Sequence, residues 1–244
     1  YNYCLDPDGK CLDDVLVYRT AEDRYMVVVN AANAEKVWAW WNAAVDGKHE
    51  VDREFTWREI GKDVRIRDLK DAESAMDRRV DVALQGPVAK ETLLRAVGQA
   101  ADRERIGALL RSQHCNARVA DLDVIVSRTG YTGEPLGYEL FVHPDQAPTL
   151  WDALLEKGKD LGVVPTGLGA RDSCRTEAGF PLYGHELAGP HDVTPTEAGY
   201  GWFVKRHKPF FVGKLPYLRR EAERKMQVAR FVVGRSGAKA VKPG

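Results

Sequence analysis

The sequence predicts an α+β fold in which helices pack against mostly antiparallel sheets. Short runs of β-branched and aromatic residues come in pairs joined by polar turns, which is typical of hairpins. The helical segments between these pairs do not follow the strict strand-helix-strand alternation of a parallel sheet. With 244 residues, of which 44% are hydrophobic, the chain is long enough to bury a substantial core without disulfides or metals.

The strands are predicted from short apolar runs bounded by turn-forming residues. In chain order they are expected over residues 13–19, 24–30, 64–69, 80–84, 118–120, 123–128, 137–142 and 227–233. The first two flank a polar turn at 20–23 and predict a hairpin, and a Gly-rich turn at 129–134 leads into the strand at 137–142. The strand at 64–69 is the only regular element expected in the charged segment 46–77, which we interpret as a surface excursion.

The helices are predicted from capping residues, from a proline near a first turn and from apolar spacing. In chain order they are expected over residues 34–41, 88–97, 105–112, 145–157, 166–178 and 214–225. Asn33 stands where the first helix needs a cap. Trp38 and Trp41 share one face of that helix, and we expect both in the core. Pro87 immediately precedes the second helix, where proline is tolerated.

Charge and composition exclude several classes of protein. The chain has 36 basic and 36 acidic residues, so its formal charge is zero, and we expect neither a nucleic-acid nor a membrane partner. Its apolar runs fall far short of the ~20 residues that a membrane-spanning helix needs. The four cysteines are irregularly spaced, which indicates reduced thiols. We therefore expect a cytoplasmic protein, or a mitochondrial matrix protein in a eukaryote.

The common catalytic and cofactor motifs are absent from the sequence. It contains neither the dinucleotide fingerprint nor the phosphate-binding P-loop. It has no serine nucleophile elbow, and its His and Cys residues lack metal-ligand spacing, so we expect no metal. The basic clusters at 205–208 and 219–225 are interpreted as solvated faces. The alternative is a contact with the polyanionic tail of a small molecule.

Two adjacent acids, Asp13 and Asp14, open the first predicted strand. Neighbouring side chains of a strand face opposite sides, so we expect one acid in a cleft and the other in solvent. A carboxylate placed in this way can stabilise a developing cation, although a simple pair of acids beside a turn remains the alternative. Asn30 and Asn33 offer amides that could recognise a heteroaromatic edge, and helix capping is the simpler explanation for Asn33.

A second charged group lies on the helix predicted over 166–178. Arg171 and Arg175 are four residues apart, so they repel unless an anion or a carboxylate lies between them. Asp172 can pair with Arg175, which leaves Arg171 to meet a ligand or another acid such as Glu139. The alternative is that all these charges form structural ion pairs.

Six motifs together resemble one family. In order they are DDVLVYR, VVNAANAEK, ALQGP, RTGYTGE with GYEL, GLGARDSCRTEAGFPLYGHEL and TPTEAGYGWFVK. Over nearly the whole chain they are similar to the T-proteins, the aminomethyltransferases of the glycine cleavage system, and to their folate-dependent relatives. The resemblance implies a folate-binding α+β region over 1–226, formed by two subdomains with a boundary near 80–120. Residues 227–244 would begin a C-terminal β domain whose barrel is largely missing, so the chain looks truncated at both ends.

The resemblance also implies which residues form the site. Asp13 matches the catalytic carboxylate beside the folate nitrogens, and Glu139 matches the acid that binds the pterin. The complete set of folate-binding residues implied by the motifs is Tyr1, Asn30, Asn33, Tyr131, Glu139 and Arg171.

The implied reaction is the transfer of a methylene carbon from an aminomethyl-lipoyl carrier protein, similar to H-protein, to tetrahydrofolate, with release of ammonia. Tetrahydrofolate would be a co-substrate, and no metal is implied. Two alternatives remain open: another tetrahydrofolate-dependent methyltransferase or demethylase, and a folate-binding module without turnover.

Overall fold

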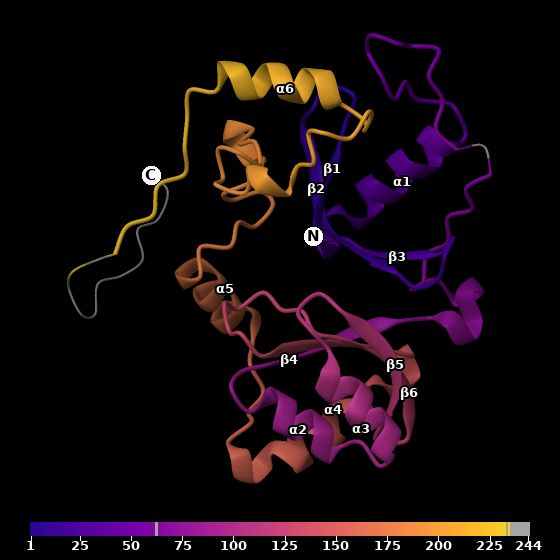
Figure 1. The fold of residues 1–244 in the computed structure, drawn as a ribbon, viewed down its shortest axis with the longest axis vertical. Helices are drawn as coiled ribbons and strands as arrows, with labels where there is room; N and C mark the ends of the chain where they lie inside the picture. The colour runs from indigo at the N-terminus through magenta and orange to yellow at the C-terminus, as the bar shows by residue number, and fades with distance from the viewer. Residues whose placement is uncertain (62, 233, 235–244) are drawn as a thin grey trace. The chain divides into compact units, whose positions relative to one another are not determined.

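The computed structural model describes residues 1–61, 63–232 and 234. It confirms the α+β class with antiparallel sheets (Figure 1). The described residues divide into two compact units, one within Tyr1–Asp63 and Pro181–Gly244 and the other within Val64–Phe180. The first unit is therefore discontinuous in sequence. The subdomain boundary near 80–120 and the C-terminal β domain from residue 227 stay predictions.

The first unit contains a sheet of three antiparallel strands in the order β1-β2-β3. Its strands are β1 (Asn2–Leu5), β2 (Cys11–Arg19) and β3 (Tyr25–Val28), and its α-helices are α1 (Ala34–Val45) and α6 (Lys214–Glu223). The predicted hairpin is confirmed by the pairing of β2 with β3. The short strand β1 was not expected, and it makes β2 the central strand of the sheet.

In the first unit, loop residues pack together with strand and helix residues in one core cluster. Leu5 and Cys11 from the sheet pack in a cluster with Leu187 and with Tyr217 of α6. Gly9 has φ +73°, and a Cβ at this position would collide with the backbone of Tyr217. The guanidinium of Arg220 also donates to the carbonyl of Gly9 at 3.0 Å. Glycine at position 9 thus allows the turn between β1 and β2 to approach α6.

The second unit contains a sheet of four antiparallel strands in the order β4-β7-β6-β5. Its strands are β4 (Val80–Gln85), β5 (His114–Val119), β6 (Leu122–Ser127) and β7 (Gly137–Val142). Its α-helices are α2 (Ala89–Arg95), α3 (Ala100–Ala108), α4 (Ala147–Gly158) and α5 (Leu168–Glu177). Figure 1 shows α2, α3 and α4 together on one side of this sheet. Leu84 and Leu140 from the strands pack with Leu93, Ile106 and Leu150 from these helices.

Short 3-10 helices complete the two units. They are η1 (Ala31–Asn33), η2 (Ala72–Asp77), η3 (Pro144–Gln146), η4 (Lys159–Leu161), η5 (Gly189–His191) and η6 (Gly201–Phe203).

Four predictions about individual elements are wrong. Residues 64–69 form no strand, because no neighbouring strand pairs with them. The strand expected over 227–233 is irregular over 227–232, and residue 233 lies outside the described residues. The helix expected over 105–112 begins earlier, at Ala100, and ends at Ala108. Trp38 is 39% exposed, because α1 buries the face that carries Val37 and Ala44 instead.

Among the described residues, no helix combines the length and the apolar character required to cross a membrane.

Candidate functional site

In the first unit, Asp13 is the centre of a buried network on β2. Its side chain has no exposed surface. The side-chain amides of Asn30 and Asn33 both donate to Asp13 Oδ1, at 2.8 and 2.6 Å, and the backbone N–H of Asn30 donates to Oδ2 at 2.9 Å. Three N–H donors thus replace the water that burial of the carboxylate removes. Asp13 therefore holds the segment after β3, and both asparagine side chains, in place.

Asp14 has a more open environment. It is half-buried, and its carboxylate accepts from the Tyr1 hydroxyl at 3.0 Å and from the Asn30 amide at 2.8 Å. Burial raises the pKa of Asp14, the neighbouring charge of Asp13 adds to the increase, and the hydrogen bonds from Tyr1 and Asn30 oppose it. The expectation that one acid of the pair faces open solvent is wrong, because Tyr1 lies over Asp14.

The two asparagines behave differently from simple helix caps. Asn33 occupies the position before α1 but makes no side-chain cap hydrogen bond. Its amide is committed to Asp13 instead, so the capping explanation for Asn33 is wrong. Asn30 links the two acids, because its side-chain amide reaches both carboxylates. The structure thus brings Tyr1, Asp13, Asn30 and Asn33 together, as the sequence interpretation requires.

In the second unit, Glu139 lies on β7, opposite Ala83 of β4 and Ser127 of β6. Its face of the sheet is the one turned away from the apolar core, since the flanking residues Tyr138 and Leu140 belong to that core. The hydroxyl of Thr129 donates to Glu139 Oε2, and Ser127 lies 2.9 Å from the same hydroxyl. A carboxylate so anchored on a strand is held rigidly.

Arg171 and Tyr131 form a cation-π pair in the same unit. The guanidinium of Arg171 lies 5.1 Å from the centre of the Tyr131 ring, which stacks on Phe180 at 5.8 Å. The predicted pairing of Asp172 with Arg175 is confirmed, with two contacts at 2.8 and 2.7 Å. Arg171 is exposed on α5, so its guanidinium stays accessible.

Gln85 is a residue that the sequence interpretation did not single out. Its side-chain amide donates to the carbonyls of Tyr138 and Thr129, at 3.1 and 3.3 Å. A Cβ at Gly130 or Gly137 would collide with this amide. Gln85 therefore fixes the turn that carries Tyr131, and the two glycines leave room for it. Gln85 belongs to the motif ALQGP. Nothing in that motif indicates that Gln85 contacts Thr129, which lies 44 residues further along the chain.

The described residues include no group of three or more His, Cys, Asp and Glu side chains placed to hold a metal ion. The candidate functional residues form two sets, and each is described within its own unit: Tyr1, Asp13, Asp14, Asn30 and Asn33 in the first, and Gln85, Thr129, Tyr131, Glu139 and Arg171 in the second.

Known proteins resemble this chain over most of its length. An aminomethyltransferase from Caldanaerobacter subterraneus subsp. tengcongensis is 38% identical over 224 residues, which are 91% of this chain and 52% of that protein. An aminomethyltransferase from Anoxybacillus flavithermus is 43% identical over 215 residues, which are 88% of this chain and 51% of that protein. The chain thus spans about half the length of the curated relatives it matches.

A solved structure gives the same result. The crystal structure of glycine cleavage system aminomethyltransferase T from Bartonella henselae matches with a TM-score of 0.66 and 29% identity, over 91% of this chain and 52% of that one. The model of the GCVT N-terminal domain family matches residues 1–208. The predicted resemblance to the T-proteins is confirmed, and the chain belongs to the GCVT N-terminal domain family.

Proposed function

We propose that this chain takes part in the aminomethyltransferase reaction of the glycine cleavage system. The methylene carbon of an aminomethyl group, carried on the lipoyl arm of a carrier protein, passes to tetrahydrofolate, and ammonia is released. Relatives named aminomethyltransferase support this proposal. The observation that carries it is the half-buried Asp14 carboxylate, which two fixed donors orient.

The proposed reaction balances without an oxidant or a metal. The carbon–nitrogen and carbon–sulfur bonds of the aminomethyl thioether break, and two bonds form between the carbon and the two folate nitrogens. The two protons on those nitrogens leave with the products, so that ammonia and a free thiol result. Positive charge develops on the carbon as ammonia departs, and a nearby carboxylate stabilises it.

In this proposal Asp14 is the residue that meets the reacting atoms. Tyr1 and Asn30 each donate to one of its oxygens, so the carboxylate needs little reorganisation as the cation forms. Its raised pKa makes it a stronger base than an ordinary aspartate, which suits removal of a proton from a folate nitrogen. Asp13 has no exposed surface, so we assign it a positioning role through Asn30 and Asn33 in place of the catalytic role first expected.

The residues of the second unit are proposed as folate contacts. Glu139 offers a carboxylate that can accept from the N–H groups of a pterin ring, and Arg171 offers an accessible guanidinium for a ligand carbonyl or carboxylate. Tyr131 presents a ring that Arg171 and Phe180 already orient. These roles are tested separately from that of Asp14.

The first experiment measures tetrahydrofolate binding by calorimetry and ammonia release from an aminomethylated lipoyl carrier protein. For Asp14→Asn we expect binding within a few-fold of the unchanged chain and a fall in turnover of at least about a hundredfold, as for loss of a group that acts in the transition state. The matched control is Asp23→Asn, in the exposed turn before β3, which should change neither quantity. Glu139→Ala and Arg171→Ala should weaken binding.

Each outcome bears on one part of the proposal. Unchanged ammonia release in Asp14→Asn would remove Asp14 from the mechanism. A folded chain that does not bind tetrahydrofolate would contradict the proposed function itself. Tight binding without any ammonia release would favour a folate-binding module without turnover, and release of a methylene group from a donor other than the lipoyl carrier would favour a related transferase.

A further inference from the structure

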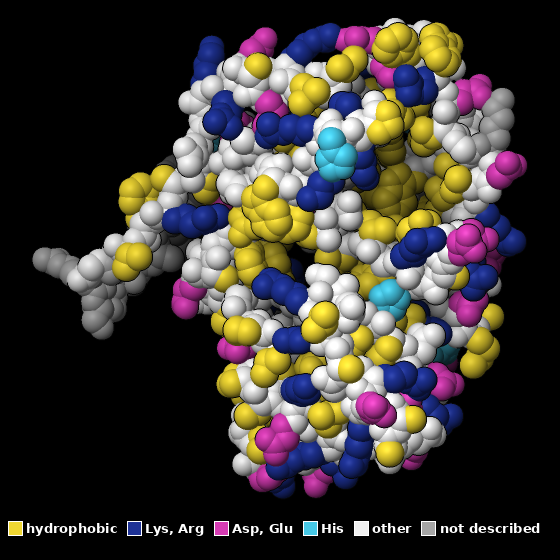
Figure 2. All heavy atoms as spheres, viewed as in Figure 1, with side chains coloured by type: hydrophobic (Ala, Val, Ile, Leu, Met, Phe, Trp, Pro, Cys, Tyr) yellow, Lys and Arg dark blue, Asp and Glu magenta, His cyan; other side chains and the backbone are white. Residues whose placement is uncertain are grey.

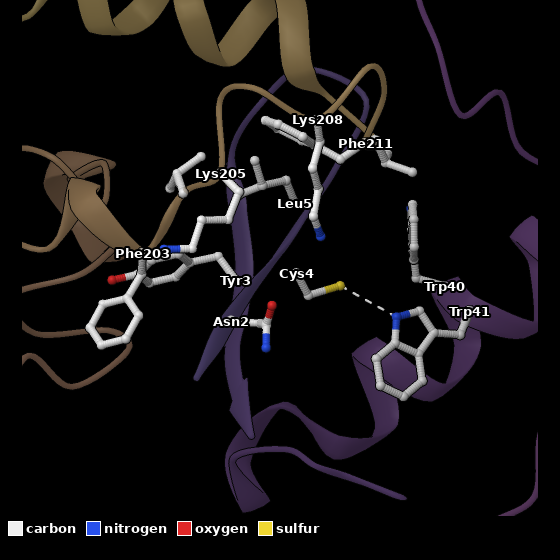
Figure 3. Close-up of a pocket in the computed structure, with 12 residues that line it drawn as sticks. Asn2, Tyr3, Cys4, Leu5, Trp40, Trp41, Phe203, Lys205, Lys208 and Phe211 are labelled. Carbon is white, nitrogen blue, oxygen red and sulfur yellow. Dashed lines mark hydrogen bonds between the residues drawn. The ribbon is translucent and has the colours of Figure 1, made fainter. Parts of the chain in front are cut away.

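The first unit contains a second feature suited to a ligand, a pocket of about 260 Å³. We call it the tryptophan pocket. It is lined by β1, by the middle of α1 and by the segment before α6, and Figure 3 shows its side chains. The lining residues are Asn2, Tyr3, Cys4, Leu5, Trp40, Trp41, Phe203, Val204, Lys205, Lys208, Phe211 and Val212. None of the residues assigned above to the candidate site is among them.

The charge of this pocket is positive. Its lining includes Lys205 and Lys208 and no acidic side chain. Lys205 Nζ is engaged, because it donates to the carbonyl of Trp202 at 3.3 Å. Figure 3 shows the amine of Lys208 extending into the pocket toward Cys4. Among the described residues, no ion-pair or hydrogen-bond partner occurs for this amine, so it is available to an anion.

The walls of the pocket are aromatic. Trp40 and Trp41 of α1 form one side, and Phe203 and Phe211 come from the loop. The indole N–H of Trp41 donates to Cys4 Sγ at 3.3 Å, which fixes the orientation of that ring. Burial raises the pKa of the Cys4 thiol to about 11, so the thiol is neutral near pH 7 and does not repel an anion. Figure 2 shows a hollow with hydrophobic side chains beside α1 and with Lys and Arg side chains around it.

We propose that the tryptophan pocket binds a small aromatic carboxylate. The aromatic walls favour a flat apolar ring, whose faces and edges can meet indole and phenyl rings. The Lys208 amine supplies one point of positive charge, which favours a single carboxylate over an uncharged group. Pockets of this kind, mostly apolar with a few placed polar groups, are the usual form of a small-molecule site. The inference does not depend on the proposed transfer reaction.

The test uses 2-naphthoate as the probe and the whole chain as it exists. Calorimetry measures its affinity, and ¹H–¹⁵N spectra of the tryptophan indoles locate it. We expect the Trp40 and Trp41 signals to move, while those of Trp57 and Trp151, which do not line the pocket, stay fixed. The uncharged 2-naphthamide should bind more weakly, by up to about fivefold, the largest factor that a partly exposed ion pair provides. Acetate, which has the charge without the ring, should not bind.

Variants distinguish a direct contact of Lys208 with the carboxylate from the effect of the chain's net charge. Lys208→Gln should weaken naphthoate binding about fivefold and leave naphthamide binding unchanged, and Lys208→Arg should restore most of the naphthoate affinity. Lys48→Gln is the matched control, because Lys48 is an exposed lysine of the same unit that already pairs with Asp46. Asp14→Asn should bind naphthoate normally, which distinguishes this pocket from the proposed folate contacts. Equal affinity for naphthoate and naphthamide, no effect of Lys208→Gln, or no shift of the Trp40 and Trp41 signals would each overturn the proposal.

Discussion

The two compact units are stabilised in different ways. In the unit of Val64–Phe180, one sheet and three helices share an apolar core that includes Leu140, a residue with no exposed surface. In the other unit, residues 181–213, all of them described, contain 3-10 turns, two isolated β-bridges and loops, but no α-helix or longer strand. These loops contribute the fully buried Leu187 and polar contacts such as the one at 2.9 Å between the Thr194 N–H and the Glu197 carboxylate. Regular elements form one core, and in the other unit irregular segments share the core with strands and helices.

This contrast predicts that the same truncation of a buried leucine lowers the free energy of unfolding by different amounts in the two units. These losses are the largest effects that we expect. Leu140→Ala and Leu187→Ala remove the same groups from side chains with no exposed surface. Such substitutions cost roughly 2–5 kcal/mol, and the cost depends on how far the surroundings collapse into the cavity. The paired strands on both sides of Leu140 resist collapse, so we expect a cost near the upper end there and near the lower end for Leu187.

Urea unfolding gives the two costs, and hydrogen exchange shows where protection is lost. The exchange should accelerate in β4–β7 for Leu140→Ala and in residues 181–213 for Leu187→Ala. Equal costs would mean that the loop-built core is as rigid as the sheet, and loss of protection throughout both units in either variant would mean that they unfold as one.

The sequence predicted some elements of both units and missed others in each. The strand β7 was predicted with its observed limits, because its apolar run is bounded by a glycine-rich turn and by the helix after it. The strand expected over 64–69 was wrong, since alternation alone cannot show whether a neighbouring strand exists. Trp38 was expected in the core, but the spacing of tryptophans does not reveal which face of α1 the loops cover. Local pattern thus sufficed for β7 and for the hairpin of β2 and β3, and it failed where the outcome depends on residues distant in the sequence.

The second prediction concerns Asp13, whose three N–H donors make the first unit depend on a buried charge. Asp13→Asn replaces one acceptor oxygen with an NH₂ group that must face a donor. Leaving such buried groups unpaired costs about 1–3 kcal/mol, so we expect the free energy of unfolding to fall by that amount. Asp14→Asn is the control and should cost less, because Asp14 is only half-buried. If Asp14→Asn proves the more destabilising variant, the roles assigned to the two acids must be reversed.

The sequence identifies candidate site residues, but it does not show how their side chains contact one another. Alternation along β2 predicts opposite faces for Asp13 and Asp14, yet it could not show that the Tyr1 hydroxyl donates to Asp14 or that the Asn30 amide reaches both carboxylates. These contacts join residues up to 17 positions apart, the separation between Asp13 and Asn30. Gln85 was missed for the same reason, because its partners lie on distant strands and turns.

The smallest expected effect is a dependence of stability on pH that belongs to Asp14 alone. Because burial raises the pKa of Asp14 in the folded chain, the folded state holds a proton at pH values where the unfolded state, with an ordinary pKa near ~4, has lost it. Stability from this group is fully present below the unfolded pKa and is lost as the pH rises through the folded pKa.

Asn does not titrate, so the free energy of unfolding of the unchanged chain should fall relative to that of Asp14→Asn as the pH rises from about 4 toward neutrality. Urea unfolding of both chains across this range measures the difference. Tyr1→Phe should enlarge it, because the Tyr1 hydroxyl donates to the charged form of Asp14 and opposes the rise in its pKa. A difference that stays constant with pH would mean that Asp14 titrates as an exposed acid does. Asp14 would then be no stronger a base than an ordinary aspartate, and its proposed role would be only to stabilise the positive charge that develops on the transferred carbon.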